Sequence, residues 1–319
     1  MSQDPVSIDN AFSGPLLGGS HEPTFAGAQS FMRRRFSKDI GQADVVVWGV
    51  PFDGATSNRP GARFGPAAIR RASSIFDGDP QYPSRRDPFA EMAVIDAGDC
   101  YFEYERLQDA PKLIESQARQ IVSRERQLVT LGGDHFVTLP LLRAHAAVHG
   151  KLALVQFDAH QDTWDDDGTK MSHGTFVTRA VSEDLIDVNR SVQVGVRTVA
   201  PHDYGMEIID METCAAMGSA GVAARIKARV GPGPAYLTFD IDALDPAFAP
   251  GTGTPVAGGL TSADALATIW RLGEIDFRGM DVVEVCPPYD HSDVTAIAAA
   301  TVIQRYLQIL AARRRGERF

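Results

Sequence analysis

Residues 152–162 read LALVQFDAHQD, and this stretch indicates both the fold and the place of the chemistry. Its first six residues form a short, almost continuous apolar run, which is typical of a parallel strand buried on both faces. Three polar residues, Asp158, His160 and Asp162, follow at every second position. In open parallel sheets, sites form outside the carboxyl ends of the strands. The residues that follow each similar run are therefore candidates for function.

Seven further apolar, β-branched runs recur along the chain, at residues 45–50, 93–95, 128–131, 192–196, 206–209, 236–239 and 280–285. Apolar spacings of three and four between many of them predict helices over 66–72, 111–125, 139–149, 261–272 and 292–312. This alternation predicts an α/β fold with a mainly parallel sheet. Residues 1–30 are rich in Gly, Ser and Pro and predict an extended arm. No linker or repeat interrupts the remainder, so we expect residues 31–319 to form one domain.

Composition excludes several classes of protein. The 319 residues are 44% hydrophobic and carry a formal net charge of −10, which argues against a general affinity for nucleic acid. We expect no membrane span, because no apolar stretch approaches the necessary length. The cysteines are three in number and far apart: Cys100, Cys214 and Cys286. This pattern is typical neither of a disulfide framework nor of a thiolate metal site, and it predicts a cytoplasmic location. We interpret Arg33–Arg35 as a solvated basic patch.

Acidic and histidine residues also follow two other runs, as GGDH at 132–135 and DID at 240–242. Residues at every second position of a strand project to one side. The six candidate ligands that result are His135, Asp158, His160, Asp162, Asp240 and Asp242. Carboxylates at the end of a buried strand need partners or a cation, and two divalent ions would balance four carboxylates with neutral histidines. Ligation by carboxylate and imidazole without thiolate favours Mn²⁺ over structural zinc.

Simpler interpretations exist for single residues. A lone aspartate after a strand is more often a helix cap, and a lone His135 is more often a satisfied buried histidine. The combination at three strand ends is hard to explain as caps and favours a metal site. His145 and His149 stand four residues apart on a predicted helix but lack the Glu of H-E-x-x-H, so we interpret them as a solvated helical face.

Three long motifs, GGDH at 132–135, FDAHQD at 157–162 and TFDIDALDPAFAPGTGTP at 238–255, resemble the signatures of the ureohydrolases. This family comprises arginases, agmatinases and related guanidino hydrolases, and the resemblance covers residues 44–312. It implies an arginase-like three-layer α/β/α sandwich with about eight strands, a pair of Mn²⁺ ions and a homo-oligomer, trimer or hexamer. The stretch 172–197 is most similar to bacterial agmatinases.

The resemblance also implies roles for individual residues. One ion would be held by His135, Asp158, Asp162 and Asp240, and the other by His160, Asp158, Asp240 and Asp242. His173 resembles the family's proton-shuttling histidine, and Glu284 the glutamate that pairs with the substrate guanidinium. Without the family, a loop histidine and a strand-end glutamate would be the simpler interpretations. We expect Cys286 to be a packed core thiol.

The implied activity is hydrolysis of a guanidino group. The hypothesis is that a metal-bridging hydroxide, oriented by Asp162, attacks the guanidinium carbon, and that the leaving nitrogen is protonated via His173. With agmatine the products are urea and putrescine, a step of polyamine biosynthesis. The first alternative is a guanidino-acid hydrolase acting on 4-guanidinobutanoate or 3-guanidinopropanoate. A non-enzymatic metal-binding protein and a metal-dependent deacetylase are further alternatives.

The choice among guanidino substrates depends on how the end remote from the guanidino group is bound. The loop at 163–168 reads TWDDDG, and its three acids would favour a cationic tail such as the amine of agmatine, although such a run is usually a solvated face. Trp164 is a candidate for contact with the substrate. Gln161 stands where the family usually carries Thr or Ser, which puts the hydrogen bonding around the ligands in doubt.

Overall fold

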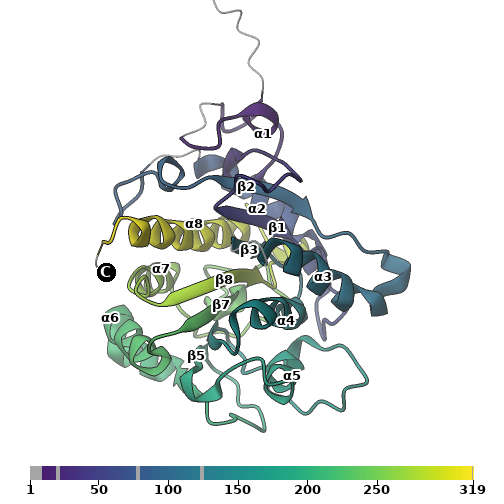
Figure 1. The fold of residues 1–319 in the computed structure, drawn as a ribbon. Coiled ribbons are helices and arrows are strands. Elements are labelled where there is room, and N and C mark those ends of the chain that lie inside the picture. The colour runs from purple at the N-terminus through teal and green to yellow at the C-terminus, as the bar shows by residue number, and fades with distance from the viewer. Residues whose placement is uncertain (1–8, 19–21, 77–79, 123–125, 318) are drawn as a thin grey trace, which may run out of the picture.

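A computed structural model describes residues 9–18, 22–76, 80–122, 126–317 and 319 of the chain. Within these residues eight strands form one sheet in the order β2-β1-β3-β8-β7-β4-β5-β6, and every neighbouring pair is parallel (Figure 1). The strands are β1 (Val45–Gly49), β2 (Val94–Asp99), β3 (Gln127–Leu131), β4 (Ala153–Phe157), β5 (Val192–Val196), β6 (Glu207–Asp210), β7 (Pro234–Asp240) and β8 (Asp276–Val283).

Each of the eight apolar runs in the sequence forms a strand, as predicted. In β1, β4 and β5 every residue is buried, because helices cover both faces of the sheet. A strand with two covered faces has no side for polar residues, so its sequence is almost continuously apolar.

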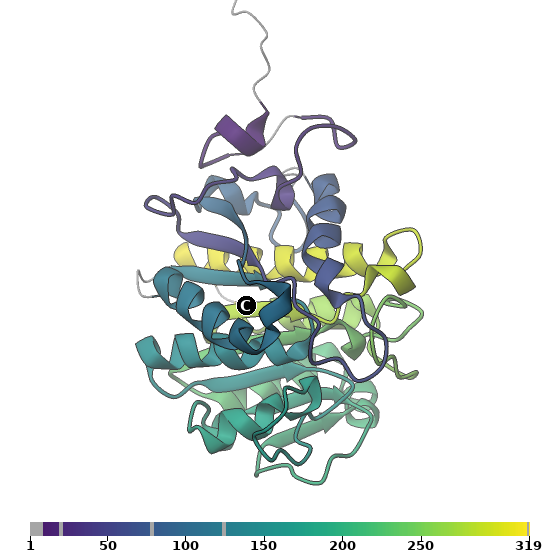
Figure 2. The same ribbon diagram turned by 90° about the vertical axis from the view of Figure 1, so that its right-hand side faces the viewer.

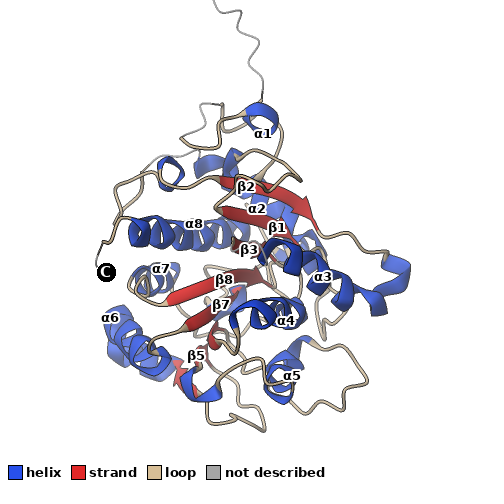
Figure 3. Cartoon of the chain, in the orientation of Figure 1, coloured by secondary structure: helices blue, strands red, loops and turns tan. Residues whose placement is uncertain are grey.

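The helices lie on both sides of the sheet, and all but the short α1 form two layers, one on each face (Figures 1 and 3). They are α1 (Asn10–Ser13), α2 (Gly65–Ser73), α3 (Ala110–Val122), α4 (Thr138–His149), α5 (Phe176–Ser182), α6 (Met211–Val230), α7 (Ser262–Trp270) and α8 (Val294–Arg314). One layer contains α3, α4 and α5, which contact one another in sequence order, and the other contains α6, α7, α8 and α2. The predicted α/β/α sandwich is confirmed.

Three of these helices were not predicted: the one-turn α1, which lies in the predicted extended arm, and α5 and α6. In α6 the segment Ala215–Val222 is dominated by Ala, Gly and Ser, so apolar and polar residues do not separate into faces. Gly218 has φ +63° and interrupts the helical backbone, which further weakens the periodic signal.

The expectation that no apolar stretch could span a membrane was wrong for α8. By length and composition this helix could cross a bilayer, with a mean hydropathy of 1.4 over its most apolar window. In the structure 72% of that window is buried, as in the core helix of a soluble protein. Figure 2 shows the yellow α8 lying across the molecule beside the sheet.

The segment after the predicted arm lies along the edge strand β2. Asp96 N donates to Arg35 O, and Ser37 N donates to Asp96 O, both at 2.9 Å, so Phe36 pairs with Asp96 as a parallel bridge. The prediction of a solvated basic patch here was wrong, because Arg33 and Arg34 are only 4% and 2% exposed. Parts of the predicted arm, residues 1–8 and 19–21, lie outside the described residues.

The prediction of a solvated face on α4 was wrong for His145, which is completely buried. Its Nδ1 lies 2.8 Å from Leu141 O, and its ring contacts Tyr236 edge-on at 4.9 Å. Burial lowers the pKa of His145 to about 4, so the ring is neutral. A side chain at Gly279 would meet the ring at 2.3 Å, and the glycine therefore leaves the room that His145 fills.

Candidate active site

Four neighbouring strands in the middle of the sheet, β3, β8, β7 and β4, end at one place. The candidate ligands from GGDH follow β3, those from DAHQD follow β4, and those from DID stand at the end of β7. Glu284 follows β8 directly. Because the strands are parallel and adjacent, their carboxyl ends bring these residues together.

His135 is the centre of the first group. Its Nδ1 faces carboxylate oxygens that come from the ends of β4 and β7. It lies 3.0 Å from Oδ2 of Asp158, 3.0 Å from Oδ2 of Asp162 and 3.2 Å from Oδ2 of Asp240. His135 is 1% exposed, so this group is formed away from solvent.

His160 is the centre of the second group. Its Nδ1 lies 3.1 Å from Oδ2 of Asp242 and 3.4 Å from Oδ1 of Asp158. Asp158 therefore takes part in both groups, with one oxygen toward each imidazole. Asp240 lies with the His135 group only, and its Oδ1 accepts a hydrogen bond from the backbone of Asp242 at 2.8 Å.

Like charges dominate the electrostatics of the two groups. Burial, together with the Asp158 carboxylate, raises the pKa of Asp162 to about 6. Burial and the charges of Asp242 and Asp158 raise the pKa of Asp240 well above its ordinary value. Ionising all four carboxylates in this buried space is unfavourable unless cations enter it.

The hydrogen bonds of His135 show that its donor atom suits a metal ion. Nε2 lies 2.8 Å from Oγ1 of Thr238, and this hydroxyl donates to Asp281 at 2.6 Å. The hydroxyl proton is thus already used, so Oγ1 accepts the Nε2–H of His135, and Nδ1 is the ring atom that faces the carboxylates. Burial would lower the pKa of His135, but Asp158, Asp162 and Asp240 raise it well above its ordinary value, so Nδ1 carries a proton when no cation is present. A divalent cation would displace this proton and bind between Nδ1 and the three carboxylate oxygens.

Glu284 and His173 form a second arrangement beside the ligands. Oε1 of Glu284 accepts from Nδ1 of His173 at 2.8 Å and from the backbone N–H of His135 at 2.9 Å. Burial would lower the pKa of His173, but the Glu284 carboxylate raises it to about 9. The other oxygen, Oε2, is buried and without a hydrogen-bond partner within the described chain. Oε2 is therefore available to a ligand donor.

Two of the candidate site residues have left-handed backbones. Asp162 has φ +53° and Glu284 has φ +61°. Such a conformation costs a non-glycine residue roughly 1–3 kcal/mol and tends to occur at functional sites.

A cavity of about 290 Å³ opens beside these groups. Its lining residues are Ser57, His160, Asp162, Trp164, Ser172, His173, Gly174, Asp240 and Thr254. None of these nine is Lys or Arg. Ser57 was not predicted, since nothing in its local sequence marks it, yet its Oγ lies 2.7 Å from Nε2 of His173.

The acidic loop does not line this cavity, except through Trp164. Asp165 is exposed and lies 2.8 Å from Nε2 of His202. Asp166 is paired with Arg179, whose Nη2 donates to it at 3.0 Å. The loop acids are thus occupied away from the cavity.

Comparison with known proteins gives the family. The family model described as "Arginase family" matches residues 43–308. The chain belongs to the arginase family. An agmatinase from Chromobacterium violaceum is 50% identical over 306 residues, covering 95% of both chains. An agmatinase from Escherichia coli O7:K1 is 47% identical over 273 residues, covering 85% of this chain and 89% of the relative.

Solved structures of the arginase family agree with this assignment. A hypothetical agmatinase from Burkholderia thailandensis has a TM-score of 0.95 at 49% identity and covers 97% of this chain and 99% of its own. Proclavaminate amidino hydrolase from Streptomyces clavuligerus has a TM-score of 0.86 at 38% identity and covers 91% and 99%. The resemblance stated from the motifs is confirmed.

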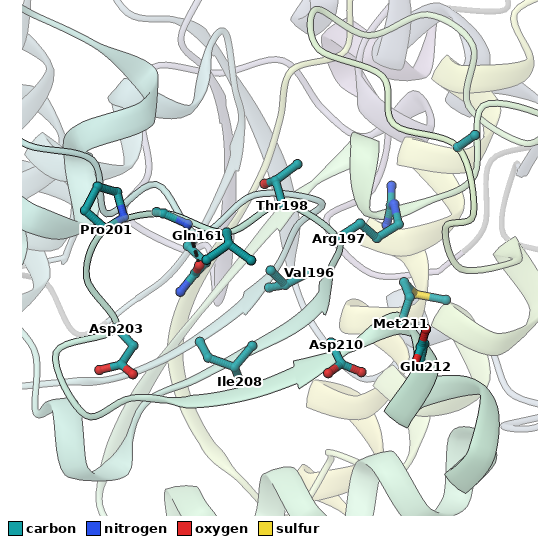
Figure 4. Close-up of a pocket in the computed structure, with 13 residues that line it drawn as sticks. Gln161, Val196, Arg197, Thr198, Pro201, Asp203, Ile208, Asp210, Met211 and Glu212 are labelled. Carbon is teal, nitrogen blue, oxygen red and sulfur yellow. Dashed lines mark hydrogen bonds between the residues drawn. The ribbon is translucent and has the colours of Figure 1, made fainter.

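Gln161, the departure from the usual family sequence, points away from the metal-ligand groups. Its Oε1 accepts from the backbone N–H of Ala200 at 2.8 Å. Figure 4 shows it beside Val196 and Pro201 in a separate cavity of about 640 Å³. In this arginase-family chain, Gln161 therefore fixes the loop after β5 and leaves the ligand atoms undisturbed.

Proposed function

We propose that the chain hydrolyses agmatine to urea and putrescine in the cavity at the ends of β3, β8, β7 and β4. The observation that carries the proposal is the convergence of six candidate ligands, five in the two groups and Asp162 against His135, beside a buried glutamate oxygen that lacks a hydrogen-bond partner among the described residues. The agmatinase relatives, at close to 50% identity over most of the chain, supply the substrate.

The proposed ligands are the six residues already named, with His135, Asp158, Asp162 and Asp240 on one ion and His160, Asp158, Asp240 and Asp242 on the other. Asp240 lies with the His135 group, so its place on the second ion rests on the family resemblance alone. Their donors are carboxylates and imidazoles without thiolate, which supports Mn²⁺. Two such ions would neutralise the carboxylates and lower the pKa of a water molecule in the site.

Glu284 binds and orients the guanidinium. Its Oε2 is buried, so a cationic N–H donor would gain a charge-assisted hydrogen bond that water does not weaken. Gly253 supports this role, because a side chain there would approach Oε2 to 3.1 Å and narrow the space for a ligand. The guanidinium is thereby held with its carbon toward the metal ligands.

His173 supplies the proton that the leaving amine needs. Hydrolysis breaks one carbon–nitrogen bond of the guanidinium, and the nitrogen that leaves must be protonated. With a pKa of about 9, His173 carries a proton at neutral pH. Asp162 lies in the cavity wall and orients the attacking water by accepting its proton in a hydrogen bond.

The cavity favours an amine at the far end of the substrate. No Lys or Arg stands among its lining residues to pair with a carboxylate tail, whereas the face of Trp164 can attract a cation. The agmatinase names of the relatives likewise do not favour a guanidino-acid hydrolase. We also propose a cytoplasmic location, which three free and buried cysteines support, and a homo-oligomer, trimer or hexamer, which rests on the family resemblance alone.

The test is urea release from a panel of guanidino compounds by the Mn²⁺-loaded protein, with the metal content measured on the same sample. We expect about two ions per chain and the highest kcat/KM for agmatine, ahead of arginine, 4-guanidinobutanoate and 3-guanidinopropanoate. Faster turnover of a guanidino acid would reverse the choice of substrate. Full activity with one ion would contradict the two-ion centre, and two bound ions without urea from any compound would indicate a non-enzymatic protein.

A further inference from the structure

Two glutamines are buried inside the sheet directly behind the candidate metal ligands. Gln156 lies in β4 and Gln193 lies opposite it in β5, in register, and both side chains are completely buried. A buried amide is costly unless its donors and acceptor are satisfied. The partners of these two side chains therefore show what the pair does.

Gln156 holds the carboxylate that the two groups share. Its Nε2 donates to Oδ2 of Asp158 at 2.8 Å, and this is the oxygen that faces His135. The other oxygen, Oδ1, accepts from the backbone N–H of His160 at 2.7 Å. Each carboxylate oxygen thus accepts from one amide N–H in addition to facing an imidazole, and the two amide donors fix the rotation of the carboxylate between the two imidazoles.

Gln193 in turn fixes the orientation of Gln156. Nε2 of Gln193 donates to Oε1 of Gln156 at 2.7 Å and to the backbone carbonyl of Gln161 at 2.5 Å. With Oε1 of Gln156 taken as an acceptor, its amide nitrogen must face Asp158. The reversed amide would place oxygen against the carboxylate and nitrogen against a donor, which is unfavourable at both ends.

We infer that Gln156 and Gln193 are positioning residues that orient Asp158 as a bridge between two metal ions. Neither touches the cavity, so they act only through Asp158 and the loop that carries it. The inference rests on the two-ion centre proposed above. Residues that orient a metal ligand typically contribute about 10- to 100-fold to metal affinity.

Gln308 on α8 is a natural comparison. It is 1% exposed, and neither of its amide atoms has a hydrogen-bond partner in the described part of the chain. It lies in the core, in the helix layer that includes α7, and has no link to the ligands. Replacing it makes the same chemical change in the core without touching Asp158.

The experiment titrates Mn²⁺ into the metal-free full chain carrying Gln156→Met, Gln193→Met or Gln308→Met. Free Mn²⁺ is followed by electron paramagnetic resonance, which also reports the coupled signal of two neighbouring ions, and thermal melting of each metal-free variant reports folding. We expect Gln156→Met to weaken Mn²⁺ binding about 10- to 100-fold and to diminish the coupled signal. Gln193→Met should act in the same direction but less, and Gln308→Met should leave affinity unchanged. Gln156→Asn, which keeps the amide but shortens its reach, replaces Gln156→Met if that variant does not fold.

Two results would overturn the inference: a Gln156 variant that binds two Mn²⁺ ions as tightly as the parent, or equal weakening by Gln308→Met. The outcome is separate from that of the proposed function, because urea is not measured. A parent chain that binds no pair of ions would contradict the proposed centre itself, whereas an unaffected Gln156 variant of a two-ion parent contradicts only the role of the glutamines.

Discussion

Asp96 in β2 and Asp158 after β4 are both completely buried carboxylates, but their surroundings differ in kind. Asp96 forms a two-pronged ion pair with Arg70, at 2.8 and 3.0 Å, and accepts the backbone N–H of Phe31 at 2.7 Å. The ion-pair contacts of Asp158 among the described residues are to histidines only.

This difference distinguishes a carboxylate that stabilises the fold, Asp96, from one that is free to bind a metal ion, Asp158. At the edge of the sheet the chain supplies its own cation, so the buried charge is complete when the protein folds. At the centre, in the part of the chain that the structure describes, no Lys or Arg forms an ion pair with the several carboxylates, which leaves the opposite charge to come from solution. Arg197 lies nearby, but its Nη2 donates to the backbone carbonyl of Asp242 at 2.6 Å. That no Lys or Arg of the described chain forms an ion pair with these buried acids is thus as informative as the acids themselves.

The strongest test of the contrast is Asp158→Asn. The substitution removes the ligand common to both groups, so we expect urea release to fall to background and Mn²⁺ binding to fail. The metal-free protein should also melt earlier than the parent, because, despite burial, the contacts of Asp158 with His135 and His160 lower its pKa, so the folded state favours this charge. Asp184→Asn, at an exposed acid, is the matched control and should change neither property. Retention of two ions by the Asp158 variant would contradict the shared-ligand geometry.

His173→Ala separates proton transfer from metal binding. If His173 only moves protons, kcat should fall by roughly 10²- to 10⁴-fold while Mn²⁺ content stays at the parental value. The measurements are steady-state urea release and metal analysis on the same preparation. A parallel loss of metal would show that His173 is a ligand.

Asp96→Asn tests whether the Asp96–Arg70 ion pair contributes to stability and not to metal binding. Removing one partner of a buried ion pair should lower the free energy of unfolding by about 3 kcal/mol, toward the lower end of the usual range because Arg70 keeps Asp99 at 2.6 Å. Mn²⁺ affinity of the folded fraction should not change. Arg71→Gln, which breaks an exposed pair with Asp293, should cost less than about 1 kcal/mol by denaturant unfolding. A loss of metal affinity in the Asp96 variant would remove the distinction drawn here.

The buried pair of His173 and Glu284 is intermediate between the Asp96–Arg70 pair and the metal-ligand groups, and it should make the stability of the protein depend on pH. The pKa of His173 is raised in the folded state, so its contribution is complete below about pH 6.5 and is lost as the pH rises through 9. Relative to His173→Ala, the metal-free parent should therefore lose about 2–3 kcal/mol between pH 6 and 10. His202→Ala, at a more exposed histidine, should keep the parental slope. A slope unchanged by His173→Ala would show that the pair does not titrate in this window.

The smallest effect is expected from the acidic loop. Asp165 is 84% exposed and pairs with His202, so Asp165→Asn should change the kcat/KM ratio of agmatine to 4-guanidinobutanoate by less than about twofold. Trp164→Ala should change this ratio more, because Trp164 lines the cavity. A large effect of Asp165→Asn would restore the sequence-based view that the loop acids select the cationic tail.

Eight apolar runs were enough to predict eight strands, because a strand covered on both faces has a sequence unlike that of its connections. The ligand-type residues were visible for the same reason: a charge directly after such a run is out of place. What could not be predicted is which side chain meets which. Gln156 interrupts its apolar run, but its partner Gln193 is 37 residues further on, and only the pairing of β4 with β5 joins them.

The wrong predictions share a cause. His145 and Arg34 are polar, and polarity in a sequence predicts exposure unless a specific partner is known. His145 is buried because Leu141 and Gly279 give it a hydrogen bond and a space, and Arg34 because it lies over the ring of Phe89 at 4.2 Å. Such compensations come from residues distant in sequence or from the backbone, and no local pattern records them.

The short segment along β2 bears on how the protein avoids joining to other copies of itself through its sheet. An open edge strand presents a row of unpaired backbone groups, which can recruit a strand from another molecule. Arg35 and Ser37 occupy such groups on Asp96, and the buried side chain of Arg34 anchors the segment in place. A chain that begins after Ser37 would keep every residue of the cavity but expose the backbone of β2. We therefore expect such a chain to aggregate and not to lose its catalytic residues.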